Sequence, residues 1–87
     1  MELTIDQAMQ QGIDAHKNGD LVLAERLYRA ILETQPFHPD ANHNLGILAI
    51  SSNNSFSAIN FLRTALNENP KNEQFWLSYI EALIIER

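Results

Sequence analysis

The chain has 87 residues, of which 45% are hydrophobic, and its 6 basic and 11 acidic side chains give a formal net charge of −5. A chain of this length forms one small domain, and its negative charge disfavours binding to nucleic-acid backbones and to anionic membrane surfaces. The sequence has no cysteine, which excludes disulfides and cysteine-based metal or nucleophilic sites, and without a long apolar run or a signal-peptide pattern we expect it to be cytoplasmic.

Helix-boundary signals in chain order predict an all-α protein with five helices. Thr4 and Gln7 have the spacing of a capping box at the start of the first helix. The residues expected to cap the later helices are Asp20, Asp40, Asn54 and Asn72. The predicted helices cover residues 5–17, 20–34, 40–52, 55–68 and 73–86. Because the connections are short, successive helices are expected to pack as antiparallel neighbours.

The sequence repeats itself at an offset of 34 residues. The identical pairs are Asp6 and Asp40, Gly12 and Gly46, Ile13 and Ile47, Ala15 and Ala49, Ala24 and Ala58, Arg29 and Arg63, Leu32 and Leu66, and Pro36 and Pro70. Small residues recur where paired helices would cross closely, and proline recurs where a two-helix unit would end. The pattern therefore predicts a repeated helical hairpin.

These residues resemble the tetratricopeptide repeat family, whose unit is a 34-residue pair of antiparallel helices. The family's signature positions in the second unit are occupied by Leu45, Gly46, Ala49, Ala58, Leu62, Ala65, Leu66 and Pro70. Asn42 replaces the usual early aromatic residue of that unit, and the first unit departs from the pattern at Gln11 and Ile31. The resemblance implies a right-handed α-solenoid over residues 1–87, with one repeat at 5–38, a second at 39–72, and a partial third repeat at 73–87.

The two repeated glycines have an expected packing role. We expect Gly46 to face Ala58 on the second helix of its unit, and Gly12 to face Ala24 in the same way. The missing side chain would let the two backbones approach closely, which offsets a helix-propensity cost of up to about 1 kcal/mol.

By resemblance, the first helix of each unit forms a concave wall that holds a peptide or a helix. The candidate groove residues are Met9, Ile13, His16, His43, Asn44, Ile47, Ile50, Leu77 and Glu81. Asn44 stands where many family members place an asparagine that hydrogen-bonds the backbone of a bound peptide. Ile13 and Ile47 have an alternative role, because side chains at these positions can simply fill the space between neighbouring first helices.

The carboxylate clamp with which some family members hold heat-shock-chaperone tails is not expected here. The corresponding positions carry Met9, Ile13, Asn44, Gln74 and Ser78. Only the asparagine fits, and a carboxylate requires cationic or several amide donors. The three histidines lack the spacing of a metal site and the neighbours of a catalytic base, so no metal, cofactor or enzymatic activity is expected.

The last predicted helix is apolar nearly all round, although the end of a solenoid normally has a polar outer face. The residues expected on a surface for self-association, or for a further helix of a longer protein, are Phe75, Trp76, Tyr79, Ile80, Leu83 and Ile84. The first functional hypothesis is a protein-interaction module within a larger protein or complex, similar to bacterial segments that precede transferase domains. The alternative is a structural unit that forms a homodimer through residues 73–87.

Overall fold

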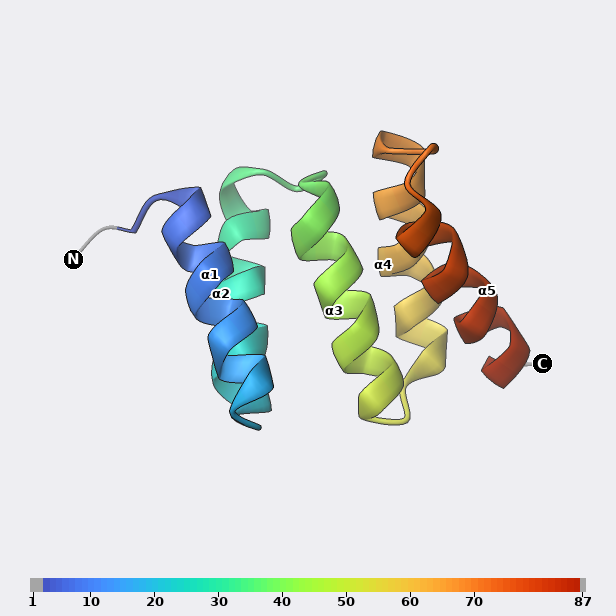
Figure 1. The fold of residues 1–87 in the computed structure, drawn as a ribbon, viewed down its shortest axis with the longest axis horizontal. Helices are drawn as coiled ribbons and strands as arrows, with labels where there is room; N and C mark the ends of the chain where they lie inside the picture. Colours follow the sequence, from blue (N-terminus) through green and yellow to red (C-terminus); the bar gives the residue numbers. More distant parts are fainter. Residues whose placement is uncertain (1–2, 87) are drawn as a thin grey trace.

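The computed structural model describes residues 3–86 and has five helices arranged in chain order (Figure 1). The helices are α1 (Ile5–Lys17), α2 (Leu21–Thr34), α3 (Pro39–Ser51), α4 (Ser55–Glu68) and α5 (Glu73–Glu86). Each predicted boundary lies within one residue of the observed one, and residues 3–86 contain no strand, which confirms the all-α prediction. None of these helices combines the length and the hydrophobicity needed to cross a lipid bilayer.

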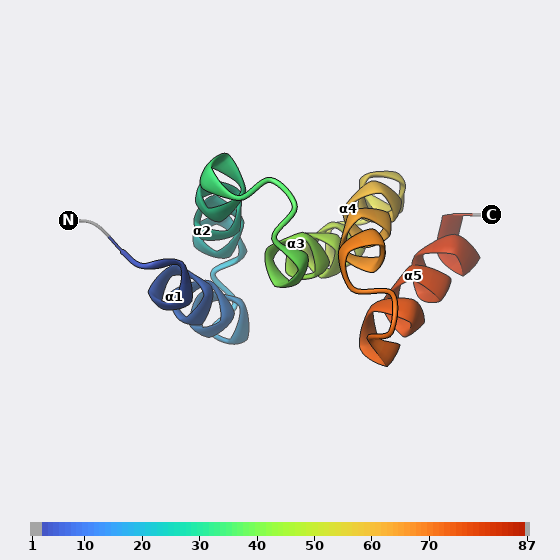
Figure 2. The ribbon, with the colours of Figure 1, turned by 90° about the horizontal axis from the view of Figure 1, so that it is seen from above.

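The helices form an elongated solenoid that measures 42 × 26 × 19 Å along its principal axes. Seen from above, α2 and α4 lie on one side of the molecule and α1 and α5 on the other, with α3 between them (Figure 2). Helix α1 packs on α2, α3 packs on both α2 and α4, and α5 packs mainly on α4 with a smaller contact to α3. The molecule is therefore a helical-repeat solenoid, in which each hairpin contacts the next.

The helix starts follow the predicted capping chemistry with one exception. Thr4 and Gln7 form the complete capping box, and Asp20 and Asn54 accept hydrogen bonds from the backbone at the starts of α2 and α4. Asn72 does the same for α5, where its Oδ1 accepts from the Phe75 N–H at 3.1 Å.

The predicted cap of α3, Asp40, is wrong. This helix begins one residue earlier, at Pro39, and its cap is His38, whose Nδ1 accepts from the Ala41 N–H at 3.1 Å. Proline at the first helical position fixes a φ angle that suits the helix and has no N–H to satisfy, so the helix starts one residue earlier than predicted.

Asn42, which stands in place of the family's early aromatic residue, has a structural role of its own. It is buried, and its Nδ2 donates to the carbonyls of Pro36 and His38 at 3.1 and 2.9 Å. The bond to Pro36 fastens the connection between α2 and α3, whereas the His38 carbonyl also accepts from the Asn42 backbone N–H at 3.1 Å.

The repeated glycines allow close helix packing, but against different residues from those predicted. A Cβ atom at Gly12 would lie 2.5 Å from Tyr28 Cε1, and one at Gly46 would lie 2.6 Å from Leu62 Cγ. The predicted partners Ala24 and Ala58 are fully buried one helical turn before these residues. The larger side chain at the next turn extends over the glycine, which is why it makes the closest approach.

Candidate functional site

A pocket of about 350 Å³ lies between α1 and α3. The residues that line it are Ile13, His16, Lys17, Tyr28, Asn44 and Ile47. Four of them, Ile13, His16, Asn44 and Ile47, belong to the predicted groove. The 34-residue offset places Ile13 and Ile47 at equivalent positions of neighbouring first helices, so the repeat itself brings the two isoleucines together.

Tyr28 gives this pocket a polar group that the sequence analysis did not identify. Its side chain is fully buried, and within residues 3–86 its hydroxyl has no hydrogen-bond partner. Burial raises the pKa of the Tyr28 phenol, and the nearby Asn44 side chain opposes this shift. A buried hydroxyl without a partner costs about 1–3 kcal/mol. The repeat offset contains the relevant signal, because Tyr28 is equivalent to the apolar Leu62.

Asn44 is held at the edge of the pocket by its neighbour His43. The Nδ1 atom of His43 lies 3.2 Å from Asn44 Oδ1, and its Nε2 atom lies 2.8 Å from the Ser78 hydroxyl. In the neutral imidazole, Nδ1 donates to Asn44 and Nε2 accepts from Ser78. This arrangement uses the Asn44 oxygen and leaves its Nδ2 as a donor for a ligand.

His43 itself is buried and does not line the pocket, so its assignment to the groove surface was wrong. Helix α5 covers it, with Ser78 at hydrogen-bond distance and the Phe75 ring stacked on the imidazole at 4.7 Å between centroids. Burial lowers the pKa of His43, and the bond to Asn44 and the charge of Asp40 oppose this shift. His43 therefore acts as an internal link between α3 and α5.

The other predicted groove residues lie outside the pocket. Met9 packs against the core formed by α1, α2 and α3, and Ile50 packs against the Ala58 and Leu62 cluster. Leu77 and Glu81 are exposed on α5. The helical register correctly placed these residues on first helices, but the neighbouring helices cover them to very different extents.

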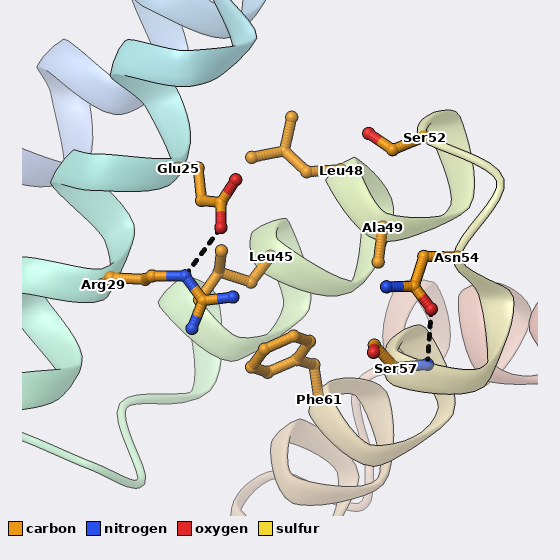
Figure 3. Close-up of a pocket in the computed structure, with 9 residues that line it drawn as sticks. All are labelled: Glu25, Arg29, Leu45, Leu48, Ala49, Ser52, Asn54, Ser57 and Phe61. Atoms are coloured by element: carbon orange, nitrogen blue, oxygen red, sulfur yellow. Dashed lines mark hydrogen bonds and ion pairs between the residues drawn. The ribbon is translucent and has the colours of Figure 1, made fainter.

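A second pocket, of about 150 Å³, lies between α2 and the second hairpin (Figure 3). Several of its polar side chains are already paired. Arg29 Nε donates to Glu25 at 2.7 Å, the guanidinium lies 5.7 Å from the Phe61 ring centroid, and Asn54 accepts from the Ser57 N–H. Of these contacts, only the one between Arg29 and Phe61 joins the two hairpins. The hydrogen bonds of Glu25, Arg29 and Asn54 make these side chains less available to a ligand.

The exposed apolar surface of α5, which we call the α5 stripe, is the other feature that the sequence predicted in part. It consists of Trp76, Leu77, Ile80, Leu83 and Ile84, whose exposed fractions range from 42 to 60%. Phe75, which was predicted to belong to this surface, is only 3% exposed because it packs against Ala65 and Leu66 of α4. Tyr79 is half-buried against the same cluster.

Within residues 3–86 no three histidine or carboxylate side chains lie close enough together to hold a metal ion. His38 is engaged as a helix cap and His43 is bonded between Asn44 and Ser78. The α1–α3 pocket combines two apolar side chains, Ile13 and Ile47, with the polar residues Tyr28 and Asn44.

Lowering the pH from 7.5 to 5.5 is expected to destabilise the protein through His43. Because its pKa in the folded state lies below the usual 6.5, the unfolded chain takes up the proton first. The contribution of neutral His43 to the free energy of unfolding is therefore complete above pH 6.5, and it is lost as the pH falls below that value. Urea unfolding at both pH values should show a smaller pH dependence for His43→Gln than for the natural chain. If His43→Gln left the pH dependence of stability unchanged, the attribution of this dependence to His43 would be wrong. The control is His16→Gln, which removes a histidine outside the α3–α5 contact.

Comparison with known proteins agrees with this architecture. A family model described as tetratricopeptide repeat matches residues 15–78, a stretch that runs from the end of α1 into α5. No curated protein matches the sequence significantly. The matched stretch covers most of the chain and includes both residues of the pocket on α3, so the chain belongs to the tetratricopeptide repeat family.

Proposed function

We propose that the chain is a protein-interaction module that holds a peptide or a helix in the pocket between α1 and α3. Tetratricopeptide repeats generally mediate protein–protein interaction, which supports a polypeptide partner. The observation that carries the proposal is a pocket in which the repeat-equivalent Ile13 and Ile47 lie beside the partly exposed Asn44. An apolar side chain of the ligand would contact Ile13 and Ile47, while a backbone carbonyl of the ligand accepts from the Asn44 amide.

We further propose that chaperone carboxylate tails are not the natural ligands. Of the five positions that form such a clamp in the family, only Ile13 and Asn44 line the pocket. Ser78 is buried and bonded to His43, so it cannot reach a ligand. The cation that does line the pocket, Lys17, is a single exposed side chain, which offers little compensation for desolvating a carboxylate.

On the family resemblance, we infer that the module acts by binding rather than by catalysis, within a larger protein or complex of the bacterial cytoplasm. The net charge of −5 supports a protein partner over nucleic acid, because a negatively charged chain repels the phosphate backbone.

Ile47→Asp is expected to weaken peptide binding while leaving the helices intact. Ile47 is half-buried and lines the pocket, so a carboxylate there would lose apolar contact and remain partly solvated. Peptides selected from a displayed library on the natural chain should bind this variant at least about 10-fold more weakly, measured by fluorescence anisotropy.

The matched control is Val22→Asp, which puts the same charge at a 70% exposed position of α2. It should bind the selected peptides as well as the natural chain does. Equal binding by the Ile47→Asp chain, with an unchanged far-UV spectrum, would exclude the α1–α3 pocket as the binding site. Asn44→Ala adds a finer test, because it removes the partly exposed amide that lines the pocket and should weaken binding.

Self-association is the second candidate function, and the exposure of the α5 stripe favours it. The largest exposed apolar patch on a soluble protein is often an interaction site. The five residues share one helix and none is charged, so we propose that α5 associates with an apolar surface of another molecule.

A further inference from the structure

We propose that the α5 stripe forms a two-fold symmetric dimer contact, in which α5 packs antiparallel against α5 of a second copy with Ile80 on the symmetry axis. The proposal rests on the second candidate function, self-association, and specifies its geometry.

The five residues of the stripe lie on one face of α5. At 100° per residue they fall within an arc of about 120°, and Ile80 is at its centre. The buried residues Phe75, Ser78 and Ala82 lie on the opposite side of the helix, where α5 contacts α3 and α4. The stripe is therefore directed away from the solenoid, and one helix can lie along its whole length.

The spacing of the stripe is self-complementary. Trp76 and Ile84 are each four residues from Ile80, and Leu77 and Leu83 are each three residues from it. When two such helices pair antiparallel about Ile80, Trp76 meets Ile84 of the second copy and Leu77 meets Leu83 of the second copy. A two-fold contact requires this reciprocal pairing, and the three- and four-residue spacings are those by which packed helices interdigitate.

The edges of the stripe are also compatible with this arrangement. Glu81 flanks the stripe, and the antiparallel pairing places it beside Tyr79 of the second copy rather than beside another carboxylate. A phenol can donate a hydrogen bond to a carboxylate, so the rim of the contact contains a favourable polar pair. The chains still repel each other through their net charge of −5, and added salt should therefore strengthen the dimer.

A repeat-type second helix fits the stripe poorly. Ile80 occupies the register of Gly12 and Gly46, where even a Cβ atom would come within 2.5 or 2.6 Å of the side chains on the paired helix. A helix packed on α5 as α2 is packed on α1 would therefore collide with Ile80. Two bulky stripes can instead interlock at the ordinary interaxial distance of about 8–10 Å.

The area of the stripe is sufficient for a specific contact. With 42 to 60% of each large side chain exposed, the five residues offer on the order of 500 Å² per chain, or about 1,000 Å² for the pair. This is the lower limit for a specific protein interface, so we expect a reversible dimer rather than an obligate one.

Sedimentation equilibrium on the natural chain should show a monomer–dimer equilibrium, and Ile80→Glu should weaken it at least about 100-fold because both copies lose a buried side chain. Ile80 is partly exposed, so the monomer should keep its far-UV spectrum. Phe56→Glu is the control, since Phe56 is 69% exposed on α4 and should leave the equilibrium unchanged.

Cysteine cross-linking tests the geometry, because the natural chain has no cysteine. Under mild oxidation Ile80→Cys should form a disulfide-linked dimer rapidly. Leu77→Cys alone should not, since its two copies lie on opposite sides of the axis, but it should cross-link to a tagged Leu83→Cys chain.

The experiments distinguish a failure of self-association from a failure of the proposed dimer geometry. A natural chain that stays monomeric up to high micromolar concentration overturns self-association and the proposed dimer together. A dimer that survives Ile80→Glu, or in which Leu77→Cys alone cross-links as fast as Ile80→Cys, overturns only the antiparallel contact about Ile80. The peptide-library experiment on the α1–α3 pocket is independent of both results.

Discussion

Replacing Phe75 with alanine is expected to lower the free energy of unfolding by about 3–5 kcal/mol. Phe75 is 3% exposed, packs against Ala65 and Leu66, and stacks on His43. Truncation leaves a cavity between α4 and α5 and removes the aromatic partner that covers the imidazole. Since Phe75 supplies much of the apolar contact that holds α5, its truncation should mainly weaken the docking of this helix on the rest of the molecule.

Trp76 makes this local effect measurable. It is the single tryptophan of the chain and lies on α5, so its fluorescence reports this helix, while the far-UV signal reports all five. Repeat proteins can unfold one unit at a time, so Phe75→Ala should lower the fluorescence midpoint in urea more than the far-UV midpoint.

The control is Phe56→Ala, which makes the same chemical change at a 69% exposed position of α4. It should alter the free energy of unfolding by no more than about 0.5 kcal/mol. If Phe75→Ala proved as mild as Phe56→Ala, the docking of α5 through Phe75 would be wrong.

Gly46→Ala is expected to destabilise the protein by about 1–3 kcal/mol, although alanine is the better helix former by up to about 1 kcal/mol. The added methyl would lie 2.6 Å from Leu62 Cγ and 2.7 Å from Leu62 Cδ2, on a side chain that is itself fully buried. Neither α3 nor α4 can relieve this overlap without disturbing the core that each shares with the next helix.

A double-mutant cycle identifies the cause. Leu62→Ala alone should cost about 2–5 kcal/mol, but in the Gly46→Ala background it removes the overlap, so the double variant should cost less than the sum of the two. Asn60→Ala, at an exposed position of α4, serves as a control without a packing change. Strict additivity of the two core substitutions, measured by urea unfolding, would show that the glycine is not required by Leu62.

Much of this fold is encoded locally and could be read from the sequence. Caps such as Asn72 and breaks such as Pro36 act within a few residues, so they set the helix boundaries without reference to the rest of the chain. The error at Asp40 has the same local origin, because Pro39 and His38 together form a start that competes with the aspartate. The 34-residue offset then determined which helices pair.

The candidate site was less predictable, since it depends on how far neighbouring helices cover each position. Ile13 and Ile47 were found because the repeat makes them equivalent, and the pocket includes both. Phe75 was misplaced because α5 is apolar nearly all round, so its periodicity does not show which face is buried. His43, on α3, was misplaced because the buried face of α5 covers it. Only the tertiary packing of α5 on α3 and α4 selects Phe75 over its neighbour Trp76.

The hydrogen-bonded series from Asn44 through His43 to Ser78 crosses from the wall of the pocket to the terminal helix. If a peptide binds the Asn44 amide as proposed, we expect it also to hold the His43 imidazole in place against Ser78. Binding would then be reciprocally coupled to the docking of α5: an occupied groove would make α5 harder to detach, and a detached α5 would weaken binding.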